Sequence, residues 1–394
     1  MGQIEYILNI NKYFLAFYYM SKKILFVHFI FVTVLTVELP AYGGDSNSIK
    51  SQTPRITNLS LHGFNLTAWE KGGWGIDMPV DEGLQFALDE GANFIAMDWA
   101  VNFNNDGTIV EQGGPSHPRM SDIKAVIGKA KAMKFYVMLK PHVTMATTCY
   151  NRNFWNSDVN EFKPSNFFPA WKKYLIDLAE CTAQNKVDAI CIGTEINNVD
   201  WQFRNEWVNL IDELRLHFSG DLTYDAIFNL SGEIKDVNEV VFWDKLDFIG
   251  CSLYVPLTHY DNTTVDSLKM RWINNSTGSI RNVIAYLRNI SKRYNKQLMA
   301  LEGGYQSVSG GLYAVNDPPS PAKTVNNDLQ SRGLEAYLSI LYKNKGTWLK
   351  GVSLWQITPL MMTPEAINTI WHTQEFTVYK KPAAEVVKKY YTLN

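Results

Sequence analysis

The sequence predicts a (β/α)8 TIM barrel with long loops at the carboxyl ends of its strands. Eight short apolar segments follow one another along the chain, and amphipathic segments with helical spacing lie between them. The links that follow the apolar segments are long, whereas the links that precede them are short. Repeated alternation of strand and helix implies parallel strands with crossover helices, and eight such units can close a barrel.

The eight predicted strands are spread over most of the chain. In order they are NLSLHGFNLT (58–67), NFIAMDWAVNF (93–103), FYVMLKPHVT (135–144), DAICIGTEIN (188–197), LTYDAI (222–227), DFIGCSLYV (247–255), QLMALEGGY (297–305) and LKGVSLWQIT (349–358). Apolar residues recur at helical spacing between strands, for example over 80–88, 207–218 and 334–341. The sequence contains no GxGxxG or GxxxxGK[ST] motif, so it does not indicate the nucleotide site of an open sheet.

The lengths of the connections predict where the functional site lies. The longest ones follow predicted strands and are rich in Gly, Asn, Pro and aromatic residues: 68–79, 104–121, 145–166 and 306–328. Long loops on one face only are expected of a barrel whose site lies at the carboxyl ends of its strands. An open doubly wound sheet also binds ligands there, so the loops predict the place of the site better than they predict closure.

The composition argues against nucleic acid as the main partner. The 394 residues carry a formal charge of −2, which implies no broad basic face. Aromatic residues make up 13% of the chain, and they can either stack on the rings of a ligand or fill the core. Cys191 and Cys251 lie in predicted strands as buried thiols, whereas the spacing of Cys149 and Cys181 leaves open whether they pair in an oxidising compartment.

The N-terminal region indicates export. From Met20 onward, two lysines precede an apolar run over 24–37, and Ala41-Tyr42-Gly43 offers a small-x-small cleavage site. The apolar run is shorter than the roughly 20 residues of a transmembrane helix. We therefore expect an upstream extension (1–19), a signal peptide (20–43), a linker (44–54) and a catalytic domain (55–394) in a secreted or periplasmic protein. No stable membrane span is expected after cleavage, and an uncleaved anchor is the alternative.

Two glutamates stand out because each follows an apolar strand. Glu195 ends the fourth predicted strand and Glu302 ends the seventh, on roughly opposite sides of an eight-stranded ring. Their side chains can then face one another across the mouth, as in a retaining glycosidase with carboxyl groups about 5–5.5 Å apart. The charge of one raises the pKa of the other, so that it can act first as an acid and later as a base. The alternative is that each glutamate forms a salt bridge at its strand end.

Other polar and aromatic residues gather at the same strand ends. In strand order they are Asn65 and Trp69, Asp98 and Trp99, Lys140 and His142, Asn197, Asp225, Tyr254, Tyr305, and Trp355 with Gln356. We expect several of them to bind substrate, and each has a structural alternative. His142 can brace its loop, Lys140 can pair with Asp98, and a tryptophan can anchor its loop instead of stacking on a sugar.

The segments GFNLTAWEKGGW, LKPHV, IGTE, LEGGY and SLWQ carry a resemblance to a known family. The chain resembles the (β/α)8 retaining glycoside hydrolases of clan A, and is most similar to family 113, the β-mannanases, over residues 55–390. The resemblance implies that Glu195 is the acid/base and Glu302 the nucleophile. It also implies that Tyr254 holds the nucleophile by a hydrogen bond and that Trp355 forms the floor of the subsite where the sugar is cleaved.

One position departs from the pattern of the clan. Most members have Asn immediately before the acid/base, where it bonds the sugar 2-hydroxyl, and this sequence has Thr194. A changed residue here is compatible with mannose, whose 2-hydroxyl is axial. No cofactor or metal is expected, because no His, Asp or Glu group has metal-ligand spacing in the sequence.

The sequence therefore predicts an exported retaining endo-β-1,4-mannanase that acts on a polysaccharide or oligosaccharide by double displacement. One alternative is a glycosidase of the same clan that acts on another β-glycan, such as a β-glucanase or an exo-acting enzyme. Another is a non-catalytic carbohydrate-binding barrel. The presence of both Glu195 and Glu302 favours an enzyme, because binding alone does not need a pair of acids.

Overall fold

The computed structural model describes residues 60–68, 74, 78–110, 118–145, 162–230, 235–315 and 317–393. The described residues all belong to one compact unit, Ile56–Asn394. The predicted extension, signal peptide and linker lie outside the described residues. So do Trp69 and Cys149.

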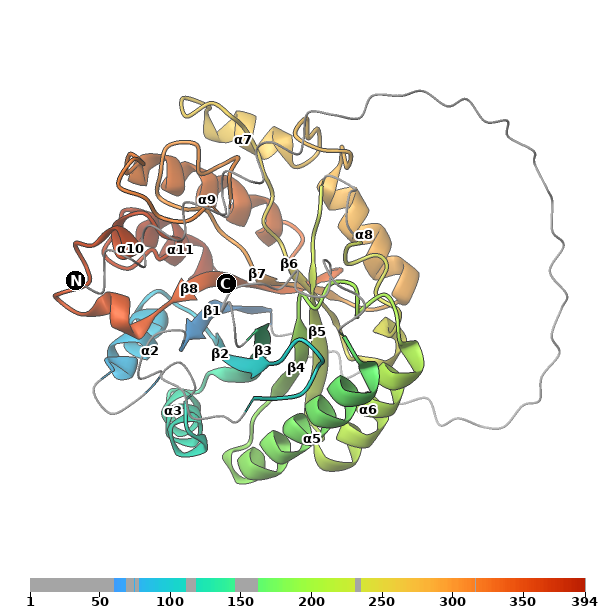
Figure 1. The fold of residues 1–394 in the computed structure, drawn as a ribbon. Coiled ribbons are helices and arrows are strands. Elements are labelled where there is room, and N and C mark those ends of the chain that lie inside the picture. The colour runs from blue at the N-terminus through green and yellow to red at the C-terminus, as the bar shows by residue number, and fades with distance from the viewer. Residues whose placement is uncertain are drawn as a thin grey trace, which may run out of the picture. The chain divides into compact units, whose positions relative to one another are not determined.

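Eight parallel strands form a closed barrel in chain order, which confirms the predicted fold class (Figure 1). The strands are β1 (Leu61–Thr67), β2 (Phe94–Phe103), β3 (Tyr136–Met145), β4 (Ala189–Thr194), β5 (Asp221–Ile227), β6 (Ile249–Ser252), β7 (Leu298–Glu302) and β8 (Leu349–Ile357). The first strand pairs with both β2 and β8, and this pairing closes the ring.

Helices surround the strands. They are α2 (Val80–Asp89), α3 (Met120–Ala132), α5 (Pro164–Thr182), α6 (Arg204–His217), α7 (Val265–Arg271), α8 (Val283–Tyr294), α9 (Asn327–Tyr342), α10 (Ile370–Thr373) and α11 (Ala383–Tyr391), with short 3-10 turns η1 (Ala183–Asn185), η2 (Trp243–Lys245) and η3 (Pro359–Met362). The three apolar stripes predicted from the sequence lie in α2, α6 and α9, where Leu84, Leu210 and Leu334 are buried. Leu88 lies off the buried stripe of α2 and is 40% exposed.

Local chemistry determines where several helices begin. Asn282 and Asn326 cap α8 and α9, because each side-chain oxygen accepts a hydrogen bond from a backbone N–H in the first turn. Thr264 does the same for α7, and Pro164 occupies the first turn of α5, where it displaces no intrahelical hydrogen bond. Among the helices of the described residues, none is both long and apolar enough to cross a membrane.

Alternation along each strand divides the buried residues into two layers. Ile95, Met97 and Trp99 of β2 point outward and join the large core between barrel and helices. Phe94 and Ala96 of the same strand belong to a second, smaller core inside the barrel. The remaining members of that inner core are Leu61, Met138, Ala189, Cys191, Phe248, Met299 and Leu301.

The inward positions change from apolar to polar toward the carboxyl ends of the strands. On β2 the inward series Phe94 and Ala96 continues with Asp98, and on β3 Met138 is followed by Lys140. The apolar inner core therefore forms the floor beneath a polar layer at the end of the barrel that carries the predicted site.

Candidate active site

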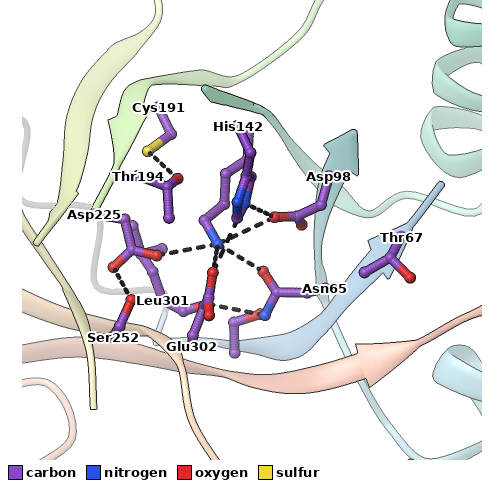
Figure 2. Close-up of polar contacts among 12 residues, drawn as sticks. Asn65, Thr67, Asp98, His142, Cys191, Thr194, Asp225, Ser252, Leu301 and Glu302 are labelled. Atoms are coloured by element: carbon purple, nitrogen blue, oxygen red, sulfur yellow. Dashed lines mark hydrogen bonds and ion pairs between the residues drawn. The ribbon is translucent and has the colours of Figure 1, made fainter. Parts of the chain in front are cut away.

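A buried ion cluster fills the carboxyl end of the barrel interior (Figure 2). The Nζ atom of Lys140 lies 2.6 Å from Oε1 of Glu302, 3.0 Å from Oδ2 of Asp225 and 3.1 Å from Oδ1 of Asp98. It also donates a hydrogen bond of 3.3 Å to Oδ1 of Asn65. These five residues come from β3, β7, β5, β2 and β1, so the closed barrel brings together groups that are remote in the sequence.

One ammonium compensates three carboxyl groups in this cluster, and the pKa values reflect the imbalance. Burial raises the pKa of Asp98 well above its ordinary value and that of Asp225 to about 7, although Lys140 opposes both shifts. Burial alone would lower the pKa of Lys140, but the carboxylates of Asp98, Glu302 and Asp225 together raise it well above its ordinary value. Lys140 is therefore a stable ammonium, and the aspartates bind protons more readily than usual.

Both carboxylate oxygens of Glu302 have hydrogen-bond donors. Lys140 donates to Oε1, and the hydroxyl of Tyr254 donates to Oε2 at 3.0 Å, which is the hydrogen bond that the family resemblance implies. The Nε2 atom of His142 lies 2.6 Å from Oδ1 of Asp98 and 3.7 Å from Oε1 of Glu302. The side chain of Glu302 is therefore fixed from two sides at the end of β7.

Glu195 lies directly after β4 in a left-handed backbone conformation with φ of 49°. This conformation costs a residue other than glycine roughly 1–2 kcal/mol, and such residues cluster at functional sites. The backbone N–H of Glu195 donates a hydrogen bond of 2.7 Å to the backbone oxygen of Asp225, and its side chain is 9% exposed. The negative charges of Glu302 and Glu195 both raise the pKa of Asp225, so both glutamates lie within electrostatic range of the same buried carboxyl group.

Trp355 borders the ion cluster from β8. Its ring centroid lies 6.2 Å from that of His142, and the ammonium of Lys140 lies 5.6 Å from it. The indole is half-buried, and the peptide bond from Trp355 to Gln356 is cis. Trp355 therefore lies beside the buried charges, and its role as the floor of the subsite stays a prediction.

Two predicted binding residues point away from the interior, and the expectation of sugar contact is wrong for both. Trp99 is 1% exposed, and its indole N–H donates a hydrogen bond of 2.8 Å to the hydroxyl of Tyr174 on α5. Its neighbour Asp98 takes the inward position, and successive residues of a strand face opposite sides. Tyr305 is fully buried against Tyr337 of α9, and its hydroxyl donates to the backbone oxygen of Val255.

Asn65 and Lys140 lie inside the barrel but are too deeply buried to contact a sugar. The amide nitrogen of Asn65 donates to the backbone oxygens of Leu301 and Leu354 and to the hydroxyl of Ser353. Its carbonyl oxygen accepts from Lys140, so its polar atoms are engaged within the protein. Of the two roles considered for Lys140, the ion pair with Asp98 is the one that the structure contains.

The residues around Glu195 are also buried. Thr194 is 2% exposed, and its hydroxyl lies 3.9 Å from the sulfur of Cys191. Asn197 is 1% exposed, and its side-chain oxygen accepts a hydrogen bond of 2.9 Å from the backbone of Asn198. Within the part of the chain that the structure describes, the buried amide nitrogen of Asn197 has no hydrogen-bond partner.

Asp98 and Asp225 stand at predicted strand ends, but the sequence assigned neither of them an individual catalytic or substrate-binding role. Asp225 contacts Lys140 and accepts a hydrogen bond of 3.2 Å from the hydroxyl of Ser252 on β6. Both aspartates can be recognised in the sequence because each continues the row of inward-facing residues of its strand. Asp98 continues the apolar series of β2 toward the carboxyl end, and Asp225 follows Thr223 at the spacing of two residues that keeps both on one face.

Among the described residues, one group has the composition and spacing that could hold a cation. Oxygen and nitrogen atoms of Asp98, His142 and Glu302 all lie within 4.8 Å of one another. The ammonium of Lys140 lies 3.1 Å from Asp98 and 2.6 Å from Glu302, so the chain itself supplies the positive charge at this point. The group is therefore better described as an ion cluster than as a metal site.

A closed (β/α)8 barrel with two strand-end glutamates and a buried charged cluster defines the class of (β/α)8 glycoside hydrolases. The model of Glycoside Hydrolase Family 113 matches residues 64–381, which is most of the chain. The protein belongs to this family and is a glycoside hydrolase.

Solved structures show the same fold at low sequence identity. A GH113 β-1,4-mannanase in a complex has 19% identity and a TM-score of 0.68, with 85% of this chain and 99% of that chain covered. The GH113 β-mannanase AaManA from Alicyclobacillus acidocaldarius, in complex with ManMIm, has 21% identity and a TM-score of 0.67, with 86% and 98% covered. XacCel5A in complex with cellopentaose has 15% identity and a TM-score of 0.52, with 84% and 99% covered. No curated protein matches the chain.

Proposed function

We propose that this glycoside hydrolase is an endo-acting β-1,4-mannanase that retains the anomeric configuration, with Glu302 as nucleophile and Glu195 as acid/base. The observation that carries the proposal is the fixed carboxylate of Glu302, whose two oxygens accept hydrogen bonds from Lys140 and Tyr254 at the substrate-facing end of the barrel. A nucleophile must be oriented before it attacks, and these two donors fix both carboxylate oxygens of Glu302.

Two steps follow from this assignment. In the first, an oxygen of Glu302 bonds to the anomeric carbon, and the glycosidic bond breaks as Glu195 donates its proton to the departing sugar. In the second, water attacks the same carbon and gives a proton to Glu195, and the bond to Glu302 breaks. Trp355 beside the cluster would support the sugar ring, because a half-buried indole offers an apolar face for stacking.

The proposed substrate rests on the similarity to solved structures and on one residue of the sequence. Two structures of similar fold are described as GH113 β-mannanases, and Thr194 before the acid/base is compatible with an axial 2-hydroxyl. We further propose that the enzyme is exported, on the strength of the lysines, apolar run and small-x-small site within residues 20–43. N-terminal sequencing of the mature protein tests export, and a mature chain that retains residues 20–43 would contradict cleavage.

The test of the proposed function is hydrolysis of β-1,4-mannan compared with β-1,4-glucan and β-1,4-xylan. We expect mannan to be cleaved internally, with the β-configuration of the first product visible by proton NMR. Glu302→Gln should lower kcat/KM by about 10⁴-fold or more, as loss of a nucleophile does in other hydrolases. Glu195→Gln should lose about 10²–10⁴-fold on mannan but much less on an aryl glycoside, whose leaving group needs no proton.

Matched thermal unfolding of the two Gln variants controls for folding, because Gln preserves the size of Glu. A preference for glucan would assign the enzyme another substrate specificity within the (β/α)8 glycoside hydrolases. Products of inverted configuration would reject Glu302 as a nucleophile, and full turnover in both variants would reject the pair altogether.

A further inference from the structure

The ammonium of Lys140 makes its shortest contact with Glu302. That distance is 2.6 Å, against 3.0 Å to Asp225 and 3.1 Å to Asp98, and the side chain of Lys140 is fully buried. Figure 2 shows Asp98, Asp225 and Glu302 around the point where the dashed lines converge, and the ammonium of Lys140 contacts all three of these residues. Because water does not reach this point, the electrostatic coupling between Lys140 and Glu302 is stronger than it would be at the surface.

The charge on Glu302 changes twice during the proposed reaction, and the inference rests on that proposed function. When Glu302 bonds to the anomeric carbon, its negative charge is lost to the new ester as the electron pair of the glycosidic bond leaves with the departing oxygen, which Glu195 protonates. When water attacks, its proton passes to Glu195. The electron pair of the ester bond then returns to Glu302 as a carboxylate. A fixed cation beside Glu302 opposes the first charge change and favours the second.

Asp98 and Asp225 keep that cation in place while Glu302 is esterified. Each lies within 3.1 Å of the ammonium, so Lys140 retains two carboxyl partners when the charge of Glu302 disappears. Asn65 is held by Leu301, Ser353 and Leu354 and accepts a further hydrogen bond from Lys140. The ammonium therefore stays charged and in position, ready for the charge to return.

We propose that Lys140 is a positioning residue that acts through Glu302. It holds the carboxylate of the nucleophile in position in the free enzyme and stabilises the carboxylate that forms when the glycosyl-enzyme is hydrolysed. Asp98 and Asp225 are the carboxyl groups that hold the ammonium in place between these two events. Among the described residues, the titratable groups around Glu302 are Lys140 and His142 on β3, Asp98 on β2, Asp225 on β5 and Tyr254 after β6, and the charge of Glu195 after β4 acts on Asp225.

The first arm of the test measures the charge of Glu302 without any substrate. The infrared carboxyl band that disappears on Glu302→Gln is followed against pH in the wild-type protein and in Lys140→Met. We expect the pKa of Glu302 to rise by at least about 1 unit in Lys140→Met, because a neighbouring cation lowers a carboxyl pKa by roughly 1–3 units. Asp225→Asn, which removes a negative neighbour and keeps the ammonium, should leave the pKa unchanged or lower it.

The second arm separates the two chemical steps with an aryl β-mannoside whose phenolate is released in the first step. Lys140→Met should show a burst of one equivalent of phenolate, followed by turnover at least about tenfold slower than in the wild type, at a pH where Glu302 is ionised. The acid limb of kcat/KM should move upward with the pKa of Glu302. A merely structural role would slow both steps together and would leave the acid limb in place.

Folding is controlled by thermal unfolding of Lys140→Met and of Lys140→Met/Asp225→Asn, because the double variant leaves two rather than three buried carboxyl groups without the ammonium. In this double variant we expect a rise in the pKa of Glu302 and a burst of phenolate, as in Lys140→Met. An unchanged pKa of Glu302 in folded Lys140→Met, or equal slowing of both steps, overturns the proposal. If the wild-type protein cleaves no β-glycoside, the proposed function fails, and the infrared arm still decides whether Lys140 controls the charge of Glu302.

Discussion

Inward-facing side chains fill both halves of the barrel interior, but those of one half are apolar and those of the other half are charged. The inner core of the amino-terminal half contains Phe94, Met138 and Met299, which fill space and have no polar side-chain group to satisfy. The carboxyl-terminal half contains Lys140 and the carboxyl groups of Asp98, Asp225 and Glu302. One half lowers the free energy of the fold by burying apolar area, and the other carries the cost of buried charge.

The comparison shows that the residues that stabilise the fold and the residues of the candidate site lie at different positions along the strand axis. Strands β2 and β3 each contribute to both halves, with an apolar residue below and a charged residue one or two inward positions above. Aspartates with raised pKa values do not stabilise a fold in their ionised form, so the cluster depends on the packed floor beneath it. Substitutions in the floor should therefore change unfolding, and substitutions at the mouth should change catalysis.

The largest expected effect is on the floor. Phe94 is fully buried, and Phe94→Ala should lower the free energy of unfolding by about 3–5 kcal/mol through lost burial and the cavity left behind. Urea unfolding followed by circular dichroism measures the change. At a temperature where the variant is still folded, the pH dependence of its activity should match that of the wild type. A shifted pH profile would show that floor and mouth are not separate.

The sequence was sufficient to predict the barrel because strand–helix alternation is a local pattern. All eight strands form where the apolar segments predict them, and Glu195 and Glu302 end the strands expected. Prediction of individual side chains was weaker at Trp99 and Tyr305, because a residue type near a strand end does not say which face it occupies. The alternation along β2 assigns Trp99 to the outer face once Asp98 is placed inward, and that argument was available from the sequence.

Other features depend on long-range packing and could not be predicted from the sequence alone. The contacts of Lys140 join residues 42, 85 and 162 positions away, and only the closed barrel sets their distances. Tyr305 packs against Tyr337 of α9, and at Gly303 a Cβ atom would lie 2.0 Å from the hydroxyl of the same Tyr337.

The next largest effect compares two tryptophans that the sequence did not distinguish. Trp355 borders the ion cluster and Trp99 packs against α5, so their substitution by Phe should have different consequences. Trp355→Phe should lower kcat/KM on β-mannan by about 10- to 100-fold, equivalent to about 1.4–2.7 kcal/mol of transition-state binding. Trp99→Phe should leave kcat/KM within about twofold and lower the melting temperature, because its indole N–H bond to Tyr174 is lost.

Steady-state kinetics and thermal unfolding of the two variants, measured side by side, give the comparison. Equal losses of kcat/KM would contradict the inward and outward assignment. A loss of kcat/KM confined to Trp99→Phe would mean that Trp99 faces the substrate and Trp355 does not.

The smallest effect concerns the pH dependence of stability at the mouth. The pKa of Asp225 is raised from 3.8 to about 7 in the folded protein, chiefly by burial, so the folded state binds more protons than the unfolded state between these values. Stability contributed by this group is therefore present at low pH and is lost as the pH rises from about 4 to about 7. The slope is at most about 1.4 kcal/mol per pH unit for one proton.

Asp225→Asn removes this titration while nearly preserving the shape of the side chain. Its free energy of unfolding, measured in urea at pH 5 and pH 7, should fall less over this interval than that of the wild type. Asp221→Asn is the matched control, because Asp221 lies at the opposite end of β5 and is partly exposed. If the free energy of unfolding depends on pH in Asp225→Asn as it does in the wild type, or if Asp221→Asn changes this dependence equally, burial of the Asp225 charge does not destabilise the fold. The contrast between the two halves of the barrel would then be wrong.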